Sequence, residues 1–473
     1  MALSKTVETE LKRLPIACKL HAHERGAGLA RIVSTLDLPK KNVLRGVLLR
    51  EPEGKVLLVV LPFNRLINFQ AIERETGYQF SPLPISHASS YFPDCAEATI
   101  PPLAKAYRLE MLLDESVKEL DSVFFEGGAG LNLVELPTKN FLMLCEDRCV
   151  KTISCSDDSV QLKAGDFDEL SLDAAPLTPA VDAKKRLEKL YKLPAMPEMA
   201  IQIIKLRNDP NSDAQKLAEI VEIDPSLSAQ VMRYANSSFF GFRGELDSIK
   251  SAISRVLGFD VVMNMALGLA AGGALRNPPD GPLGLRAFWK HATYTAALAQ
   301  ALSKQVPDQY EIKPGMAYLA GLLHNFGFLL LGHLFQPEFF LLNKMVAANP
   351  EASIVMLEKH ALGMGHAQHV LGMGHAELGG WLMQSWEMPS EVTVTVKEHH
   401  NFDYSGEHEG YPALIAVINH ILGRYEIGDD RGEGDLSMLC ERVGLDAVKV
   451  EETVETLLEK RGDLDMMAEQ FAA

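Results

Sequence analysis

Long apolar runs are missing from this 473-residue sequence. No stretch of about 18 consecutive apolar residues occurs, so we expect no membrane-spanning helix. The first residues, MALSKTVETELKRL, lack the apolar core of a secretory signal peptide and have the spacing of an amphipathic helix. The sequence therefore predicts a cytoplasmic protein.

Cysteine is scarce as well, with six residues in the chain. Cys145, Cys149 and Cys155 form a loose cluster, but no fourth ligand follows nearby. Structural zinc sites usually combine four ligands in two pairs. Reduced, buried thiols are therefore a better interpretation of these residues than a zinc site.

Basic residues are outnumbered, and the net charge is −17. The excess lies entirely after residue 155, because residues 1–155 hold as many basic as acidic side chains. An acidic surface repels phosphate backbones, so the second part is not expected to bind nucleic acid non-specifically. The neutral first part gives no special support for tRNA binding.

Four segments can be separated along the chain. Residues 46–50 and 55–62 are two apolar runs around Glu-Pro-Glu-Gly, which predicts a strand hairpin within an α/β domain over residues 1–155. Residues 156–185 are an acidic, proline-containing linker. A helical domain covers residues 186–425, and residues 426–473 form an acidic helical tail.

Helix signals dominate the second half. Asp224 followed by Pro225 is a capping carboxylate before a proline at the first helical position, and Ser212 is a candidate cap for the preceding helix. A helix over residues 289–305 is stopped by Pro307. Alternating strand patterns are scarce, so this half is expected to be all-α.

Histidine gathers in the same half, where eleven of the fourteen lie between residues 291 and 420. The sequence LGMGHA occurs at 362–367 and again at 371–376. Nine residues turn a helix through about 900°, so His366 and His375 cannot face one site from one straight helix. One copy is therefore expected to be a looped insertion.

Several motifs of this half resemble the HDOD family, a branch of the HD phosphohydrolase superfamily, over roughly 200 residues. The motifs are LPAMP at 193–197, DPSLS at 224–228, RYANSSFFG at 233–241, GLLHNFG at 321–327, WEMP at 386–389 and the pair His399-His400. The resemblance implies a helical fold. HDOD proteins are thought to be generally non-catalytic.

The HD superfamily's metal ligands include a His-Asp pair whose carboxylate can bridge two cations. By resemblance, His291 and His324 are the first two ligands, His399 and His400 supply further histidines, and Asn325 stands at the Asp position. A late Asp corresponds to Asn419. Two neutral amides at carboxylate positions argue against hydrolysis. Retention of a divalent cation by the remaining residues, or an ordinary hydrogen-bonded histidine core, both stay open.

Residues 4–150 resemble the YbaK/ProX family of aminoacyl-tRNA deacylases, through residues 43–49, the loop at 98–103 and Asp114. In that family substrate binding and a positioned water depend on a strand lysine and on backbone groups of the loop. Arg45 stands at the lysine position and Ala98 at a loop glycine, so the site is altered. Lys55, on the neighbouring strand, is a candidate substitute.

The leading prediction is a non-catalytic bacterial signalling protein. Its HDOD domain would be a protein-interaction or output module coupled to a ligand-sensing, deacylase-like domain. The family association implies signalling partners such as cyclic-di-GMP enzymes or sensor kinases. One alternative is a trans-editing deacylase that acts on tRNA with an accessory HDOD domain. Another is a metal-dependent phosphohydrolase using His291, His324, His399 and His400.

Overall fold

The computed structural model describes residues 2–13, 18–25, 28–83, 85–97, 99–145, 148–156, 193–207, 209–236, 246–362, 373–430, 432 and 435–472. The chain divides into two compact units. The first comprises Met1–Asp173 with Lys344–Ala352, and the second comprises Ala174–Asn343 with Ser353–Ala473. Ala98 and the predicted linker from residue 157 onward lie outside the described residues.

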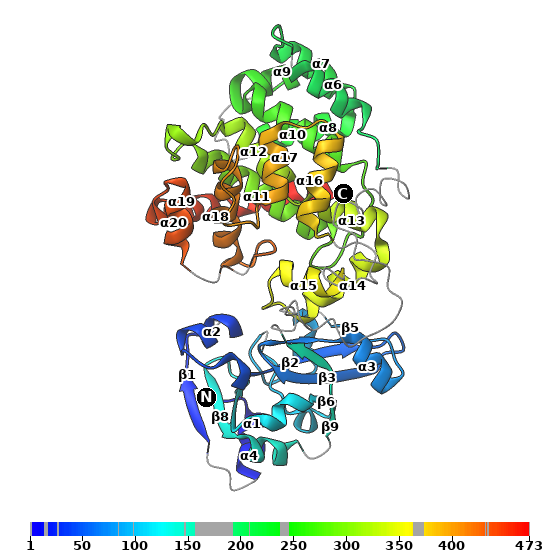
Figure 1. The fold of residues 1–473 in the computed structure, drawn as a ribbon, viewed down its shortest axis with the longest axis vertical. Coiled ribbons are helices and arrows are strands. Elements are labelled where there is room, and N and C mark those ends of the chain that lie inside the picture. The colour runs from blue at the N-terminus through cyan, green and yellow to red at the C-terminus, as the bar shows by residue number, and fades with distance from the viewer. Residues whose placement is uncertain are drawn as a thin grey trace, which may run out of the picture. The chain divides into compact units, whose positions relative to one another are not determined.

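The first unit is a mixed α/β fold built on a five-stranded sheet (Figure 1). In spatial order its strands are β5 (Ser81–Pro82), β2 (Leu44–Arg50), β3 (Val56–Pro62), β6 (Glu110–Asp114) and β9 (Arg148–Lys151). A three-stranded sheet has the order β1 (Lys19–Ala22), β8 (Asn132–Pro137), β7 (Ser122–Glu126), and β10 (Ser154–Ser156) pairs with β4 (Arg65–Ile67). Strand β6 runs parallel to both β3 and β9, whereas β2 runs antiparallel to β3.

The β2–β3 hairpin is the one that the two apolar runs predict. Leu44 lies opposite Pro62 and Arg50 opposite Val56, and Gly54 closes the turn with a φ of +102°. Because β3 is buried along almost its whole length, its sequence is a continuous apolar run without polar alternation. This strand therefore lies in the middle of a sheet that is covered on both faces.

Helices complete the first unit: α1 (Lys5–Arg13), α2 (Leu29–Thr35), α3 (Phe69–Thr76) and α4 (Thr138–Leu144). Asn68 caps α3 by accepting a hydrogen bond from the Ala71 amide, and Gly77 ends it in the left-handed conformation. The end of a much later helix, α14 (Gln336–Ala348), also belongs to this unit, and Ala348 lies in one of its apolar clusters.

The second unit is helical throughout its described residues (Figure 1). Its first helices are α6 (Glu198–Arg207), α7 (Ala214–Glu222), α8 (Pro225–Ala235), α9 (Ile249–Ala252), α10 (Phe259–Gly272), α11 (Leu285–Ser303), α12 (Pro314–Leu323) and α13 (Phe326–Leu334). After α14 follow α15 (Ile354–Ala361), α16 (His375–Ser385), α17 (Ser390–Glu398), α18 (Gly410–Gly423), α19 (Leu436–Val443), α20 (Ala447–Leu458) and α21 (Arg461–Ala472).

Short polar side chains start these helices. Asp224 accepts hydrogen bonds from the amides of Ser226 and Leu227, with Pro225 as the first helical residue, as predicted. The cap of α7 is Asp213, not the neighbouring Ser212, because the carboxylate accepts from two amides of the first turn. Carboxylates make the stronger, charge-assisted bond at a helix N-terminus.

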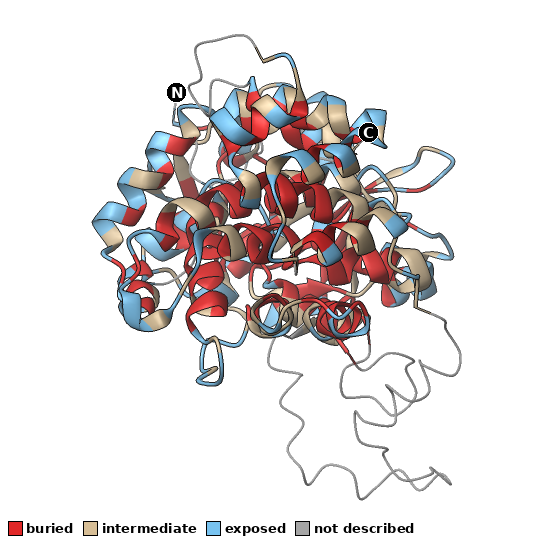
Figure 2. Ribbon diagram, turned by 90° about the horizontal axis from the view of Figure 1, so that it is seen from above, coloured by how far each residue is buried: buried red, intermediate tan, exposed pale blue. Residues whose placement is uncertain are grey.

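Apolar helices form the interior of the second unit. The stretch Pro314–Leu334 is long and apolar enough to cross a membrane, but 89% of its apolar window is buried within the fold. It is therefore a core element, and the buried residues in Figure 2 lie along such inner helices. The predicted acidic tail packs on the same core, since Phe471 stacks edge-on against Trp289 and Tyr294 donates a hydrogen bond to Asp465.

Candidate functional site: a buried histidine cluster

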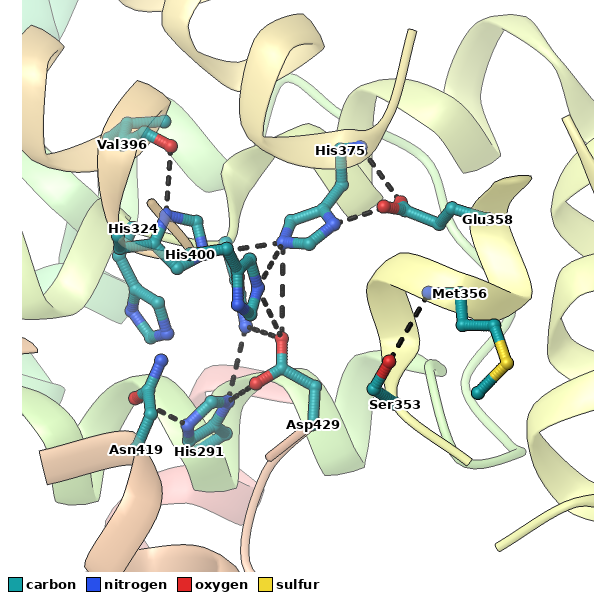
Figure 3. Close-up of polar contacts among 12 residues, drawn as sticks. His291, His324, Ser353, Met356, Glu358, His375, Val396, His400, Asn419 and Asp429 are labelled. Atoms are coloured by element: carbon teal, nitrogen blue, oxygen red, sulfur yellow. Dashed lines mark hydrogen bonds and ion pairs between the residues drawn. The ribbon is translucent and has the colours of Figure 1, made fainter. Parts of the chain in front are cut away.

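Six polar side chains from different helices meet in the second unit (Figure 3). They are His291 in α11, Asn325 between α12 and α13, His375 at the start of α16, His399 and His400 at the end of α17, and Asp429 after α18. His324 lies beside them, with its ring 4.8 Å from that of His291. All except His400 are buried.

Three imidazoles form the centre of the cluster. The Nε2 atom of His375 is 3.3 Å from Nε2 of His399 and 3.2 Å from Nε2 of His400. The Asp429 carboxylate is adjacent, with Oδ2 3.9 Å from His375 Nε2 and 3.8 Å from His400 Nε2. Four ligand atoms, one from each of these residues, lie within 4.8 Å of one another.

The opposite ring nitrogens fix how two of these imidazoles point. His375 Nδ1 is 2.8 Å from the Glu358 carboxylate, which also accepts the His375 backbone amide, and His399 Nδ1 is 2.9 Å from the Val396 carbonyl. Both partners are acceptors, so both Nδ1 atoms carry the proton. The two Nε2 lone pairs then face each other at 3.3 Å, an arrangement that a shared cation stabilises.

Burial sets the protonation of the cluster. Burial and the nearby histidines hold the pKa of His399 well below its usual range, and burial with the His291 charge lowers that of His324 to about 3. Burial also acts to lower the pKa of His375, but the Glu358 carboxylate overcomes this and raises it. Burial alone would raise the pKa of Asp429, and the surrounding histidines instead hold it far below its ordinary value.

Amides occupy the other side of the cluster. Asn325 Nδ2 donates a 2.9 Å hydrogen bond to Asp429 Oδ2 and lies 3.2 Å from His291 Nδ1. His291 Nε2 is in turn 3.1 Å from the side-chain oxygen of Asn419. His291 thus lies between the side-chain amides of Asn325 and Asn419, and one oxygen of Asp429 accepts a hydrogen bond from Asn325.

The residues fit one divalent cation on the His375 side. Four ligands at about 2.1 Å from one ion lie about 3–4 Å apart. The ligand atoms of the quartet His375, His399, His400 and Asp429 all lie within 4.8 Å of one another, so small side-chain movements would bring them onto one ion. Glu358 and the Val396 carbonyl orient two of the imidazoles, as outer partners of metal ligands do. Three imidazoles and a carboxylate suit zinc, iron or manganese.

Comparison with known proteins identifies both halves of the chain. Residues 193–402 match the family model of the HDOD domain, and residues 23–144 match that of the aminoacyl-tRNA editing domain. The chain carries an editing domain followed by an HDOD domain. The histidine cluster therefore belongs to the HDOD part, although Asp429 lies beyond the matched residues.

Similar structures cover one or both domains. A crystal structure from Marinobacter aquaeolei VT8, described as that of a candidate signal transduction protein, has 27% identity and a TM-score of 0.78 and covers 99% of both chains. An HDOD domain protein of unknown function from Geobacter sulfurreducens, with 20% identity and a TM-score of 0.50, covers 61% of this chain and 97% of its own, and shows the fold alone.

A curated relative adds no activity. An uncharacterised protein from Treponema pallidum (strain Nichols) is 26% identical over 233 residues, which is 49% of this chain. The alignment spans only 42% of that relative's own length.

In the HDOD domain the structure brings together the residues that the sequence singled out: His291, His324, Asn325, His399 and His400. Asn419 contacts His291, but the carboxylate beside the histidines is Asp429. Sequence reasoning missed His375, Glu358 and Asp429. The second LGMGHA copy was a signal for His375, because its Gly374-His375 step is where α16 begins.

In the editing domain the predicted residues are dispersed. Arg45 is buried, whereas Lys55 is largely exposed and pairs with Glu110 at 2.8 Å. Arg45 lies opposite Leu61, six residues along the chain from Lys55, so the backbone positions of the two residues are about 20 Å apart. Lys55 therefore cannot do the work of a lysine at position 45. Asp114 accepts amide hydrogen bonds from Ser116 and Ile153, a structural arrangement.

Proposed function

We propose that the protein is a signalling protein whose HDOD domain binds or docks partners and does not hydrolyse phosphodiesters. The presence of an HDOD domain and the full-length similarity to the Marinobacter protein support a regulatory role. By the family association, the partners are other bacterial signalling proteins, such as cyclic-di-GMP enzymes or sensor kinases.

The observation that carries this proposal is the hydrogen bond from Asn325 to Asp429. A two-metal hydrolytic site needs a carboxylate that bridges both cations and offsets their charge. Asn325 is neutral, and its amide donates to Asp429 Oδ2, so it presents a proton where a bridging carboxylate would present a lone pair and a negative charge. On its side lie His291, His324, amide oxygens and the other Asp429 oxygen, Oδ1, which is 4.0 Å from His291 Nδ1. A second cation would have to share this one carboxylate with the first, so it is poorly held.

One cation on the other side is compatible with this role. The quartet His375, His399, His400 and Asp429 would hold it and thereby link α16, α17 and the segment after α18. Such an ion would supply Lewis acidity to a bound water or phosphate. The chain's own residues orient the ligands through Glu358 and Val396, and we propose that this linkage stabilises the docking surface.

The altered site of the editing domain supports a binding role there as well. Arg45 keeps the positive charge of the family's lysine, but its planar guanidinium makes hydrogen bonds of fixed geometry. Each of its two terminal nitrogens donates to an oxygen of the protein. We propose that this domain senses or binds rather than edits.

Metal content and turnover of the full chain test the proposal. Purified protein is loaded with manganese or iron, its metal content is measured, and cyclic dinucleotides and bis-p-nitrophenyl phosphate are offered as substrates. We expect no more than one equivalent of metal and no turnover above that of the His399→Ala variant. Two equivalents together with turnover that His399→Ala abolishes would overturn the proposal.

A further inference from the structure

A segment from the middle of the HDOD sequence folds with the editing domain. Lys344–Ala352, which contains the last turns of α14, belongs to the first compact unit. Ala348 is fully buried there, in an apolar cluster that includes Leu49 of β2, Val59 of β3 and Leu112 of β6. The segment therefore covers one face of the five-stranded sheet.

The same segment supplies acceptors to Arg45. Arg45 is 6% exposed, and the Nη1 atom of its guanidinium donates to the Ala348 carbonyl at 2.7 Å. Its Nη2 atom donates to the side-chain oxygen of Asn349 at 2.6 Å and to the Arg65 carbonyl at 2.9 Å. Hydrogen bonds from a charged donor are about twice as strong as neutral ones, so the segment is held firmly at this point.

Asn349 makes further hydrogen bonds besides the one to Arg45. Its side-chain oxygen also accepts the backbone amide of Ile67, at 3.1 Å, and its amide nitrogen donates to the Met345 carbonyl at 2.7 Å. The side chain is 1% exposed. The Ile67 backbone amide and the Arg45 guanidinium thus both donate to the side-chain oxygen of Asn349. The side-chain nitrogen of Asn349 stabilises the last helical turn of the segment itself.

The last residues of the segment are close enough to Glu126 for the charge of Glu351 to act on its carboxylate. The Glu126 carboxylate accepts the Ile100 backbone amide at 3.2 Å. Burial, together with the charge of Glu351, raises the pKa of Glu126 to about 7. The segment therefore contacts the strand with Arg45 directly, and its Glu351 acts electrostatically on the carboxylate that holds the loop with Ile100.

We propose that the Arg45 site is a docking site for this chain's own segment Lys344–Ala352, which closes it to an aminoacyl group. The segment offers the guanidinium a carbonyl and an amide oxygen, acceptors of the kind that an aminoacyl ester would present. The editing domain acts in this protein as the receptor of an HDOD segment.

Hydrogen–deuterium exchange of the full-length protein, followed by mass spectrometry, tests the docking. The variants are Asn349→Ala, which removes the shared acceptor, and Asn349→Asp, which keeps the acceptor and adds charge but loses the bond to the Met345 carbonyl. Asn343→Ala is the matched control on α14, because that side chain accepts the Leu283 amide of the second unit. Peptides from α11 report whether each variant is folded.

In the wild-type protein we expect strong protection of β4 and of residues 344–352. Asn349→Ala should accelerate exchange in these two segments about tenfold or more, while α1, α4 and α11 keep their protection. Asn349→Asp should retain the protection, and Asn343→Ala should leave β4 unchanged. Wild-type exchange of residues 344–352 at the rate of an exposed loop would overturn the proposal. So would uniform loosening of the whole editing domain in Asn349→Ala, which would show that the segment is only part of its core.

Discussion

Restoring the missing carboxylate with Asn325→Asp is the sharpest perturbation of the histidine cluster. Without metal, the variant loses a hydrogen bond from Asn325 to a charged acceptor, which is worth about 1.5–3 kcal/mol. It also places a second buried carboxylate within hydrogen-bond distance of Asp429. We expect the free energy of unfolding to fall by at least ~3 kcal/mol, and the melting temperature of the HDOD unit to fall by about 6–12 °C.

A divalent cation should reverse this loss. Two carboxylates and the surrounding histidines can hold two ions, and an ion at 100 times its Kd stabilises the folded state by about 2.7 kcal/mol. The assay is thermal denaturation in EDTA and in millimolar manganese, together with metal analysis. We expect the metal content to rise from at most one equivalent to two, and the manganese-dependent increase in Tm to exceed that of the wild type.

Asn264→Asp is the matched control for this experiment. Asn264 is also buried and also donates its amide to an oxygen, the Gly315 carbonyl, but it contacts no residue of the cluster. The Asn264→Asp variant should have a lower melting temperature than the wild type in EDTA, and manganese should raise its melting temperature no more than that of the wild type. The reasoning would be refuted if Asn325→Asp were as stable as the wild type in EDTA, or if manganese stabilised both proteins equally.

Three further changes test single contacts. Glu358→Gln removes the negative charge that orients His375 and should weaken manganese binding about 10–100-fold in calorimetric titrations without unfolding the protein. An unchanged affinity would show that His375, His399, His400 and Asp429 are not the manganese site. Burial raises the pKa of the Glu126 carboxyl group from 4.5 to about 7. The folded protein therefore loses stability as the pH rises from 4.5 to 7, because the buried carboxyl group must give up its proton. Glu126→Gln should therefore stabilise the protein by ~3 kcal/mol at pH 8 and not at pH 4.5, and an equal effect at both would refute the assignment. Gly327→Ala places a Cβ against the His375 backbone and should cost at least ~3 kcal/mol in denaturant unfolding, whereas Gly462→Ala, which meets open space, should not.

Local patterns predicted much of the fold. The two apolar runs around Glu-Pro-Glu-Gly gave the β2–β3 hairpin, and Asp224-Pro225 gave the start of α8, because turn and cap preferences are set within a few residues. The choice between Ser212 and Asp213 as the cap of α7 was wrong, since both are good caps and only the backbone geometry decides between them.

Long-range partners could not be predicted in this way. Asp429 enters the cluster because the chain after α18 turns at Gly428, which has a φ of +101° and leaves no room for a Cβ beside the His291 ring. The glycine is a local turn signal, but the sequence does not show that the turn brings Asp429 to His400. His375 was hidden by the repeated motif, whose first copy lies outside the described residues. The contact of Arg45 with Asn349 joins residues about 300 positions apart, so no local pattern indicates it.

The central claim is that the HDOD domain does not hydrolyse phosphodiesters. It is tested most directly by measuring turnover of cyclic dinucleotides by the full-length, manganese- or iron-loaded protein beside its His399→Ala variant. We predict that the wild type and the variant give the same background rate. Metal-dependent turnover by the wild type that is absent from His399→Ala would contradict this prediction and would establish a working hydrolase despite Asn325.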